Sequence, residues 1–400
     1  MKNNGRRAAS RNRLEILSKL KPGRPSSRTE LARATGLSAA TVSRITRDLV
    51  RGRVLTEVPR PRAAAGLPAG ADPGPAKAGR PTRGLEINGR SGTVLGISLL
   101  APAARIAILN LRGDLVKEVR QPVAWHRGVG GILEPLRRAV RSLARGPARL
   151  SGVGVALPGM WERDAGISTQ YPRVPEWKNV PIRKLLEEWI RAPASLIGYA
   201  PATAVAEHAH RGDPANLLSV EVAENIAMGA IVNGAVVEGV SGNAGELGHI
   251  TVDAAGPVCY CGNRGCLETL ATCAAVEDEI RSSDAAGDLF PNPRSMTYED
   301  VVRRAQEGDA FSARLLGRAA RTLGIGLAAA LNLFSPEVLV LSGRFFEAGD
   351  LVLGPLQLSI KDHTLPSSLK RLTIDRSKLG PLAAAFGAGL VAIKGAVQRL

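Results

Sequence analysis

Apolar residues recur at helical spacing in the first sixty positions and in strand-like runs after residue 90. In "SRNRLEILSKL" (10–20), four aliphatic residues fall on one face and predict a helix: Leu14, Ile16, Leu17 and Leu20. The stretch "TVLGISLLAPAARIAILNLRGDLVKE" (93–118) reads as strand, turn, strand and hairpin turn, and "NLLSVEVAENIAMGAIVNGAVVEG" (216–239) repeats that order. Two such units, each followed by helical segments, predict an α/β body of two lobes.

Local capping signals predict two more helices in the N-terminal stretch. "SSRTELARATG" (26–36) offers Ser26 or Ser27 as its N-cap, and Glu30 completes a capping box if Ser27 is the cap. Gly36 ends that helix, and Ser38 begins the next one, "AATVSRITRDLVRGR". The segment resembles a helix-turn-helix, because a small residue, a turn glycine and a buried aliphatic residue have the spacing of that motif: Ala32, Gly36 and Val42.

The third predicted helix would be the DNA-reading element. The N-terminal end of such a helix enters the major groove, so we expect Thr41 and Arg44 to meet base edges. Phosphate contacts are expected from Arg47, Arg28 and the Ser27 hydroxyl. The whole exposed face of this helix is Ala39, Ala40, Thr41, Ser43, Arg44 and Arg47. An ordinary basic helical hairpin is the alternative, but charge, turn spacing and capping all favour DNA binding.

A segment rich in Pro, Ala and Gly separates two short predicted strands. "RVLTEV" (53–58) and "RGLEIN" (83–88) would form the wing of a winged helix-turn-helix. The residues between them include too few apolar side chains to order themselves, so they are predicted to be a linker. Alternatively, Arg80 in "AGRP" could enter the minor groove. We expect a DNA-binding domain at residues 1–58 and a wing and linker at residues 59–88.

Positive charge is concentrated at the N-terminal end of the chain. Residues 1–83 account for +14 of the formal net charge of +17, and the longer remainder is nearly neutral. A basic head on a neutral body favours a nucleic-acid partner. The first residues, "MKNNGRRAASRNR", lack the apolar core of a secretory signal, and the longest apolar runs are shorter than the ~20 residues of a membrane span. A cytoplasmic protein without a membrane partner is expected.

Three of the four cysteines lie within eight positions, in "CYCGNRGC". Clustered cysteines in a cytoplasmic protein favour metal binding over disulfides, and the two glycines of this loop allow a tight knuckle. Structural zinc takes four ligands in tetrahedral geometry, so Cys259, Cys261 and Cys266 need a fourth. Cys273 could compete for that place, although its position in a predicted helix favours a small core residue. A redox role is disfavoured because the loop contains no Cys-x-x-Cys.

The body resembles the ROK family of repressors, uncharacterised reading frames and sugar kinases. The resemblance is carried by "SGNAGELGHITVD" and "CYCGNRGCLE", and more weakly by "GVGVALPGMWE", "VPEWKNVPIRKLLEE" and "LNLFSPEVLVLSG". It implies an actin-like, sugar-kinase-like fold over residues 89–400. Lobe 1 would comprise residues 89–195 plus the C-terminal helix, and lobe 2 residues 196–383. A winged helix-turn-helix ahead of such a body is the arrangement of sugar-responsive repressors in this family.

The resemblance also implies the sugar-binding and zinc-binding residues. In the family, the Glu and His of a Gly-Glu-x-Gly-His motif and the Glu after the last zinc cysteine bind sugar hydroxyls. These positions are Glu246, His249 and Glu268 in this sequence. By the same resemblance His249 is also the fourth zinc ligand. Carboxylates suit a polyol because each accepts hydrogen bonds from hydroxyls. Alternatively, the three residues only brace the zinc loop.

Three features of the family kinases are missing from the chain. The first-lobe turn, of the Asp-x-Gly-Gly-Thr type in those kinases, is "SLLAPAA" (98–104), and the second-lobe Gly-Thr-Gly turn is "AENIAM" (223–228). Neither stretch has the glycines that let backbone N–H groups approach phosphates. Gly198 and Tyr199 take the places of the Asn and the catalytic Asp, and tyrosine is a poor base at neutral pH. We therefore expect no ATP binding and no enzyme activity.

Together these features predict a sequence-specific DNA-binding regulator, and in particular a repressor whose sugar or sugar-derivative effector closes the two lobes. Paired heads on a pseudo-palindromic operator would require a homodimer or a homotetramer. Two alternatives stay open. The chain could be a residual sugar kinase with an appended head, or a regulator whose body binds a protein partner instead of a sugar.

Overall fold

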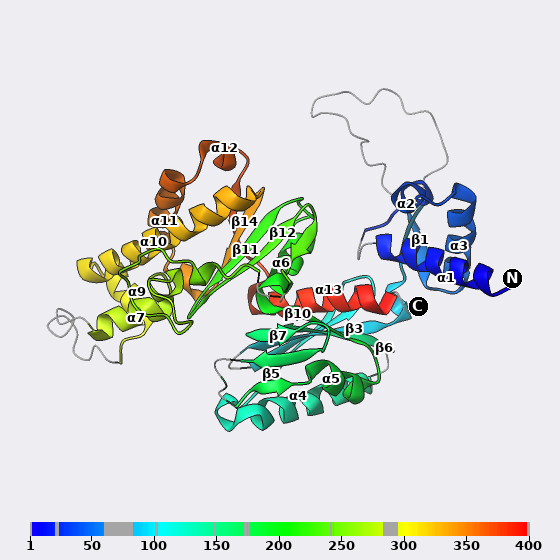
Figure 1. Cartoon of the computed structure of the whole chain (residues 1–400), viewed down its shortest axis with the longest axis horizontal. Coiled ribbons are helices and arrows are strands. Elements are labelled where there is room, and N and C mark those ends of the chain that lie inside the picture. The colour runs from blue at the N-terminus through cyan, green and yellow to red at the C-terminus, as the bar shows by residue number, and fades with distance from the viewer. Residues whose placement is uncertain are drawn as a thin grey trace. The chain divides into compact units, whose positions relative to one another are not determined.

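A computed structural model describes residues 2–20, 24–59, 83–100, 103–146, 149–171, 174, 176–240, 242, 244–282 and 295–397 (Figure 1). The chain divides into two compact units. The first comprises residues 1–155, 181–196 and 388–400, and the second comprises residues 156–180 and 197–387.

The N-terminal head of the first unit has three helices and a two-stranded wing. Its elements are α1 (Lys2–Lys19), α2 (Arg28–Thr35), α3 (Ala39–Arg51), β1 (Leu55–Pro59) and β2 (Arg83–Ile87). Ser27 caps α2 and forms the predicted capping box with Glu30; Gly36 has a left-handed φ of 68°, and Ser38 caps α3. The first helix starts at Lys2 instead of Ser10, because apolar spacing gives no signal in its polar first turns.

The head has an apolar core of its own. β1 and β2 pair in the antiparallel sense, with Leu55 opposite Ile87, and form the predicted wing. Full burial of one aliphatic side chain contributes about 1.5–3 kcal/mol to folding stability, so several such side chains together stabilise the head substantially. The buried side chains include Ile16, Leu17, Leu31, Val42, Ile45, Leu49, Leu55 and Leu85.

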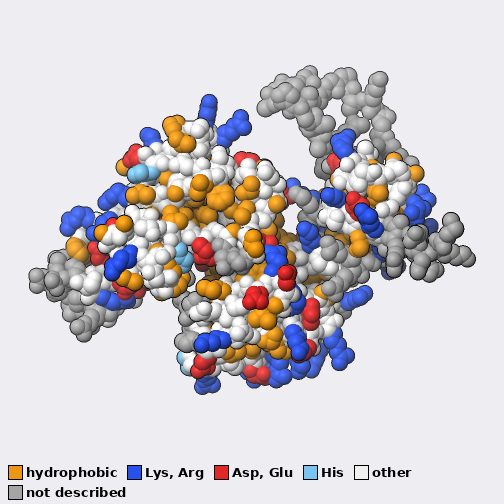
Figure 2. Space-filling view, viewed as in Figure 1, with side chains coloured by type: hydrophobic (Ala, Val, Ile, Leu, Met, Phe, Trp, Pro, Cys, Tyr) orange, Lys and Arg blue, Asp and Glu red, His pale blue; other side chains and the backbone are white. Residues whose placement is uncertain are grey.

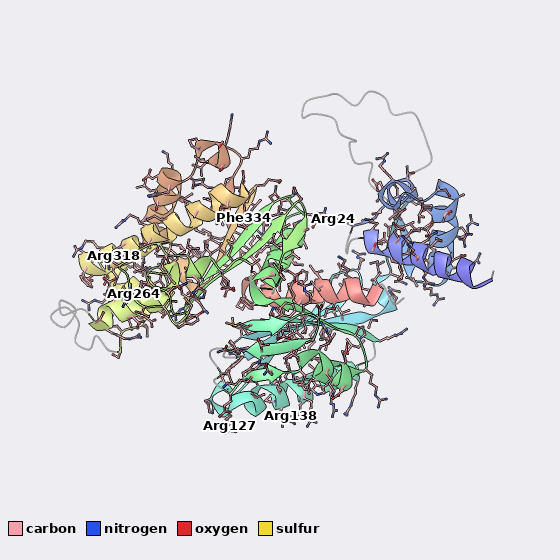
Figure 3. The ribbon with its side chains drawn as sticks, viewed as in Figure 1. Arg24, Arg127, Arg138, Arg264, Arg318 and Phe334 are labelled. Carbon is pink, nitrogen blue, oxygen red and sulfur yellow. The ribbon has the colours of Figure 1, made fainter. Side chains whose placement is uncertain are left out.

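A five-stranded sheet forms the lobe of the first unit, in the order β10-β6-β3-β4-β5. Its strands are β3 (Thr93–Leu100), β4 (Ala103–Asn110), β5 (Leu115–Pro122), β6 (Leu150–Leu157) and β10 (Ala194–Gly198). β4 pairs in the antiparallel sense with both β3 and β5. The helices are α4 (Gly128–Ala144), α5 (Ile182–Ile190) and α13 (Ala383–Val397), and Arg138 projects from the exposed face of α4 (Figure 3).

A second five-stranded sheet, in the order β13-β12-β11-β14-β15, forms the centre of the second unit. Its strands are β11 (Leu217–Val222), β12 (Ile226–Val232), β13 (Ala235–Val237), β14 (Val338–Ser342) and β15 (Thr373–Arg376). The antiparallel run β11–β12–β13 matches β3–β4–β5 of the first unit, as the sequence repeat predicts. The helices are α6 (Tyr199–His210), α7 (Cys273–Ser282), α9 (Tyr298–Gln306), α10 (Ala310–Phe334), α11 (Asp350–His363) and α12 (Pro366–Leu369).

Shorter elements complete the described part of the chain. A small sheet in the second unit contains β7 (Met160–Glu162), β8 (Ile167–Gln170) and β9 (Lys178–Val180). Single turns of 3-10 helix lie at η1 (Gly89–Ser91), η2 (Trp125–Arg127), η3 (Leu247–His249), η4 (Leu267–Thr269), η6 (Arg344–Ala348) and η7 (Gly380–Leu382).

The C-terminal helix packs so closely on the first sheet that glycines are required at the contact. A Cβ on Gly154 of β6 would lie 1.9 Å from the carbonyl oxygen of Ala388, and one on Gly389 of α13 would lie 2.6 Å from Cδ1 of Leu109 in β4. Residues 380–397 are long and apolar enough to cross a membrane, the one such stretch among the described helices, but 56% of this window is buried inside the protein. The apolar composition of α13 therefore serves its packing against the sheet.

Replacing Gly154 with alanine should weaken this contact. We expect the added methyl group to push α13 away from β6 and lower the free energy of unfolding by about 1–3 kcal/mol or more. The matched control is Gly130→Ala on α4, where a Cβ meets nothing within 4 Å. Because alanine is more stable than glycine inside a helix, the free energy of unfolding of this control should rise by about 0.5–1 kcal/mol. Equal urea-unfolding midpoints for the two variants would contradict the close contact.

Candidate functional site

α3 buries one face and presents the predicted base-reading residues on the other. Val42, Ile45 and Leu49 point into the head core. The Ser38 hydroxyl accepts the N–H of Thr41 at 3.2 Å, which fixes the first turn of the helix. Lys and Arg side chains lie at the surface of the head (Figure 2). The exposed or half-exposed residues of α3 include all six that the sequence predicts to face DNA: Ala39, Ala40, Thr41, Ser43, Arg44 and Arg47.

Arg28 takes part in a network inside the head that the sequence did not reveal. Its Nη2 lies 2.6 Å from Oε1 of Glu57, and its Nε donates to the Thr46 hydroxyl at 3.1 Å. Arg83 pairs with the other oxygen of Glu57 at 3.1 Å. Hydrogen bonds from Arg28, and then from Arg83, hold the pKa of Glu57 below its ordinary value. The network connects α2, α3 and both wing strands.

Of the two other residues predicted to contact DNA, the structure describes Ser27 but not Arg80. The Ser27 hydroxyl accepts the N–H of Glu30 at 3.2 Å as the cap of α2, so its own O–H remains a donor for a phosphate. Arg80 lies outside the described residues.

The structure brings His249 and the three loop cysteines into one cluster. Their ligand atoms all lie within 4.8 Å of one another. Cys259 Sγ is 3.6 Å from His249 Nδ1, and Cys261 Sγ is 3.7 Å from Cys266 Sγ. Four ligands bound to zinc at about 2.0–2.3 Å in a tetrahedron would be about 3.5–3.8 Å apart. Both the donor set and its spacing therefore fit one tetrahedral metal ion.

A tight backbone turn holds the cysteine loop in this shape. Gly265 has a φ of 61°, and a Cβ at this position would lie 1.4 Å from the carbonyl oxygen of Asp253. Val258 and Arg264 form an antiparallel bridge across the loop (Arg264 in Figure 3). The knuckle expected from the two loop glycines is therefore present, and Gly265 is the position where no side chain fits.

The thiols of the cluster differ in burial and in pKa. Cys266 is fully buried, and this burial raises the pKa of its thiol to about 12. The exposed Cys261 has a lowered pKa, chiefly because it accepts a backbone hydrogen bond from Asn263. A metal ion supplies the positive charge that a buried thiolate needs. Cys273 lies outside this cluster, in the apolar core of the second unit, where burial raises its pKa to about 12.

The segment that carries the predicted sugar residues runs beside β12. β13 pairs with β12 only between Ala230 and Val232, so the start of β12 has a free edge on that side. A Cβ on Gly245 would lie 2.2 Å from the Met228 carbonyl oxygen, and one on Gly248 would lie 3.1 Å from that of Ile226. The two glycines of the Gly-Glu-x-Gly-His motif thus let its backbone approach the strand.

The three predicted sugar residues differ in how firmly they are held. Glu268 is buried, and its Oε2 accepts the Ile226 N–H at 3.1 Å. The Glu246 side chain is 59% exposed, and its Oε2 lies 3.9 Å from His249 Nε2. His249 Nε2 also lies 3.1 Å from the hydroxyl of Tyr260. The structure thus brings Glu246 and His249 together and anchors Glu268 to the start of β12.

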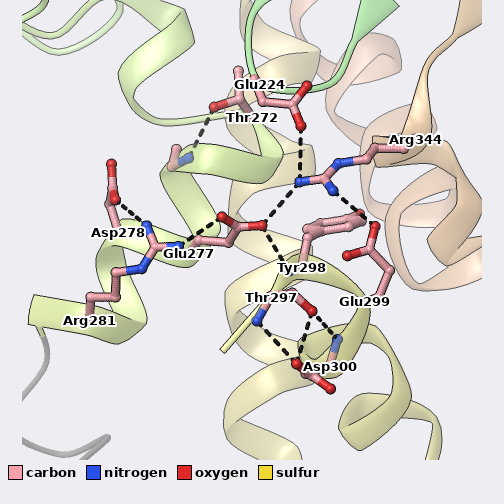
Figure 4. Close-up of polar contacts among 11 residues, drawn as sticks. Glu224, Thr272, Glu277, Asp278, Arg281, Thr297, Tyr298, Glu299, Asp300 and Arg344 are labelled. Atoms are coloured by element: carbon pink, nitrogen blue, oxygen red, sulfur yellow. Dashed lines mark hydrogen bonds and ion pairs between the residues drawn. The ribbon is translucent and has the colours of Figure 1, made fainter. Parts of the chain in front are cut away.

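At the second-lobe turn, where a family kinase would have its glycines, carboxylates form ion pairs with one arginine (Figure 4). Glu224, between β11 and β12, lies 3.1 Å from Nη2 of Arg344 in η6. Arg344 also contacts Glu277 at 3.0 Å and Glu299 at 3.1 Å. Three carboxylates around one guanidinium leave a negative surplus that repels phosphates. In the first-lobe turn, residues 101 and 102 lie outside the described residues.

Tyr199, which the sequence predicts to stand in place of a kinase's catalytic Asp, is bonded to a carboxyl group. Its hydroxyl donates to Oε2 of Glu221 at 2.9 Å. Burial, followed by the adjacent Glu221, raises the pKa of Tyr199 well above its ordinary value, and burial also raises the pKa of Glu221. A phenol that already donates its proton to a neighbour and resists ionisation is unsuited to accept a proton from a sugar.

Comparison with known proteins agrees with both parts of this architecture. The ROK family description matches residues 94–394, and the IclR helix-turn-helix domain matches residues 12–59. The chain belongs to the ROK family. The xylose repressor of Caldicellulosiruptor bescii is 26% identical over 387 residues, covering 94% of each chain. The DNA-binding transcriptional dual regulator NagC of Escherichia coli K12 is 27% identical over 361 residues, covering 89% of this chain and 86% of that one.

Solved structures include both regulators and kinases of the ROK family. A ROK family transcriptional regulator, a homologue of the E. coli MLC protein, has a TM-score of 0.76 at 25% identity and covers 98% of this chain and 97% of its own. The ROK hexokinase of Thermus thermophilus has a TM-score of 0.63 at 30% identity, covering 75% of this chain and 97% of its own. Because the regulators align with the head as well as the body, the chain is a DNA-binding transcriptional regulator.

The metal cluster can be tested with two cysteine substitutions. We expect the purified protein to contain about one tightly bound metal ion per chain, and Cys259→Ser to lose most of it, because a tetrahedral site needs all four donors. Cys273→Ala, in the core but outside the cluster, should keep its metal. Elemental analysis after dialysis against a weak chelator measures the metal content. Equal metal contents in both variants would contradict the assignment of these ligands.

Proposed function

We propose that the chain is a cytoplasmic, sugar-responsive repressor without kinase activity. Its three parts are a DNA-binding head at residues 1–58, a wing and linker at residues 59–88 and a ROK body at residues 89–400. The observation that carries the proposal is that one chain combines a complete helix-turn-helix with a body whose sugar motif is retained while its kinase turns and base are replaced.

The head would read an operator through α3. Thr41 and Arg44, near the N-terminal end, would meet base edges, and Arg47 and the Ser27 hydroxyl would bind phosphates. Arg28 is paired with Glu57, but its guanidinium has five N–H donors, so it can reach a phosphate with those that remain free. Arg80 would enter the minor groove. A homodimer or homotetramer would place two heads on the half-sites of a pseudo-palindrome.

The body would bind a sugar or sugar derivative through Glu246, His249 and Glu268. Glu246 and His249 present exposed or half-exposed polar atoms, and the loop that carries Glu268 is anchored to the sheet. The relatives are named for xylose and, through the N-acetylglucosamine repressor of E. coli O157:H7, for N-acetylglucosamine. Monosaccharides of this size are the class of effector that we propose.

A structural zinc ion would be held by His249, Cys259, Cys261 and Cys266. With four protein ligands no coordination position stays open, so the ion would brace the loop and would not activate water. Its contribution would be to keep Glu246, His249 and Glu268 in a fixed arrangement.

Loss of phosphoryl transfer is supported by two contacts. Arg344 and its carboxylate partners close the second-lobe turn, where a kinase needs room for nucleotide phosphates. Tyr199 donates to Glu221 and is no substitute for a catalytic carboxylate. Neither change affects the proposed sugar residues, so sugar binding can persist without catalysis.

The DNA-reading assignment can be tested at two arginines. Against operator fragments from a binding-site selection, Arg44→Ala should lose about 1–3 kcal/mol of discrimination between matched and mismatched sites. Arg47→Ala should weaken binding to all sites about equally. It should also reduce the slope of log affinity against log salt concentration by about 0.9, the value for one phosphate contact. Arg314→Ala, exposed on α10 of the second unit, is the control and should change neither. If Arg44→Ala keeps full discrimination, α3 is not the reading helix.

The effector assignment can be tested by thermal shift and operator release. Xylose, N-acetylglucosamine or glucose should raise the melting temperature of the full-length protein and release operator DNA, because a ligand bound to the folded state stabilises it. Glu246→Gln should weaken both responses and leave operator binding without sugar unchanged. If no sugar has an effect while DNA binding is intact, a protein partner is favoured. Consumption of ATP with any of these sugars would contradict the proposed loss of catalysis.

A further inference from the structure

We propose that Tyr260 is an effector gate: its hydroxyl occupies, in the sugar-free protein, the place that a sugar hydroxyl takes at Nε2 of His249. This inference rests on the proposed effector site and specifies how that site is regulated. Tyr260 lies between two residues of the metal cluster, Cys259 and Cys261. The sequence alone does not indicate a role for Tyr260, because its partner, His249, lies outside the cysteine loop.

The contact between Tyr260 and His249 has two independent geometric features. The Tyr260 hydroxyl is 3.1 Å from His249 Nε2, within hydrogen-bond distance. The two rings meet edge to face, with their centroids 5.2 Å apart and their planes at 81°. An edge-to-face arrangement is the favoured geometry for aromatic pairs, so the ring itself contributes to holding the tyrosine in this position.

The importance of this contact depends on which ring nitrogen of His249 carries the proton. Nδ1 faces Cys259 Sγ at 3.6 Å, so Nδ1 is the nitrogen that would bind a metal ion held by the cluster. A neutral imidazole that gives one nitrogen to a metal carries its proton on the other, and that N–H needs an acceptor. Glu246 Oε2, at 3.9 Å, is too far away to accept it. The Tyr260 oxygen takes that role in this structure.

A sugar hydroxyl bound to the same N–H must therefore displace the Tyr260 hydroxyl. The tyrosine is free to leave, because 69% of its surface is exposed and its ring is not part of the apolar core. After it leaves, the phenol can hydrogen-bond to water, so the net loss is that of one exposed hydrogen bond. Such a bond corresponds to about a two- to tenfold change in affinity. The gate would lower the affinity for every sugar and favour those whose hydroxyl replaces the lost bond well.

The test is Tyr260→Phe in the full-length, zinc-loaded protein. Phenylalanine keeps the ring beside His249 and removes only the competing oxygen. Isothermal titration with xylose, N-acetylglucosamine and glucose should show the best-binding sugar held about two- to tenfold more tightly than by the wild type. Operator release should then occur at a correspondingly lower sugar concentration. Zinc content and operator affinity without sugar should be unchanged.

Val258→Ala serves as the matched control, because Val258 is 60% exposed on the same loop and makes no contact with His249 that the structure records. Its sugar affinity should equal that of the wild type. If Tyr260→Phe binds sugar more weakly, the tyrosine is a direct sugar ligand and the gate is wrong; unchanged affinity also overturns it. If neither the wild type nor the variant binds any of the sugars, the proposed effector site itself fails, and the gate fails with it.

Discussion

The shape of the cysteine loop depends on one close backbone contact, that of Gly265 with the carbonyl of Asp253. This contact folds the cysteine loop back on itself, and the loop then places three thiols around the imidazole of His249. The chain continues directly into the fully buried Leu267 and into Glu268, whose carboxylate accepts the N–H of Ile226 at the start of β12. A single turn thus determines the geometry of the metal cluster, its attachment to the sheet and the position of one proposed sugar ligand.

The two ring nitrogens of His249 would serve two different sites. His249 belongs to the metal cluster through Nδ1 and to the proposed effector site through Nε2, with Tyr260 between the two roles. A metal ion on one side of the imidazole makes the other side a fixed N–H donor. Of the three proposed effector residues, His249 is the one whose orientation would follow from the ligand geometry of the cluster.

The second unit keeps the strand order of the first unit but has polar side-chain pairs at the two positions where a family kinase would bind nucleotide and carry its base. At the turn between β11 and β12, Glu224 forms an ion pair with Arg344. Tyr199 and Glu221 form a second polar pair where a catalytic carboxylate would act. The Tyr199–Glu221 pair gives each of its two buried polar groups a hydrogen-bond partner, so this position stays stable without a kinase's carboxylate.

Features that depend on residues close together in the chain were predictable from the amino-acid sequence. The Ser27–Glu30 capping box, the left-handed Gly36 and the knuckle glycines are set by local backbone preferences, so the helix-turn-helix, the repeated strands and the cysteine loop could be predicted. The pairing of side chains far apart in the sequence emerged from the folded structure: Arg28 with Glu57, Arg344 with Glu224, Tyr260 with His249, and Tyr199 with Glu221. The reason is physical, because a charge or a hydroxyl carries no mark of its partner until folding removes water and brings the two within hydrogen-bond distance.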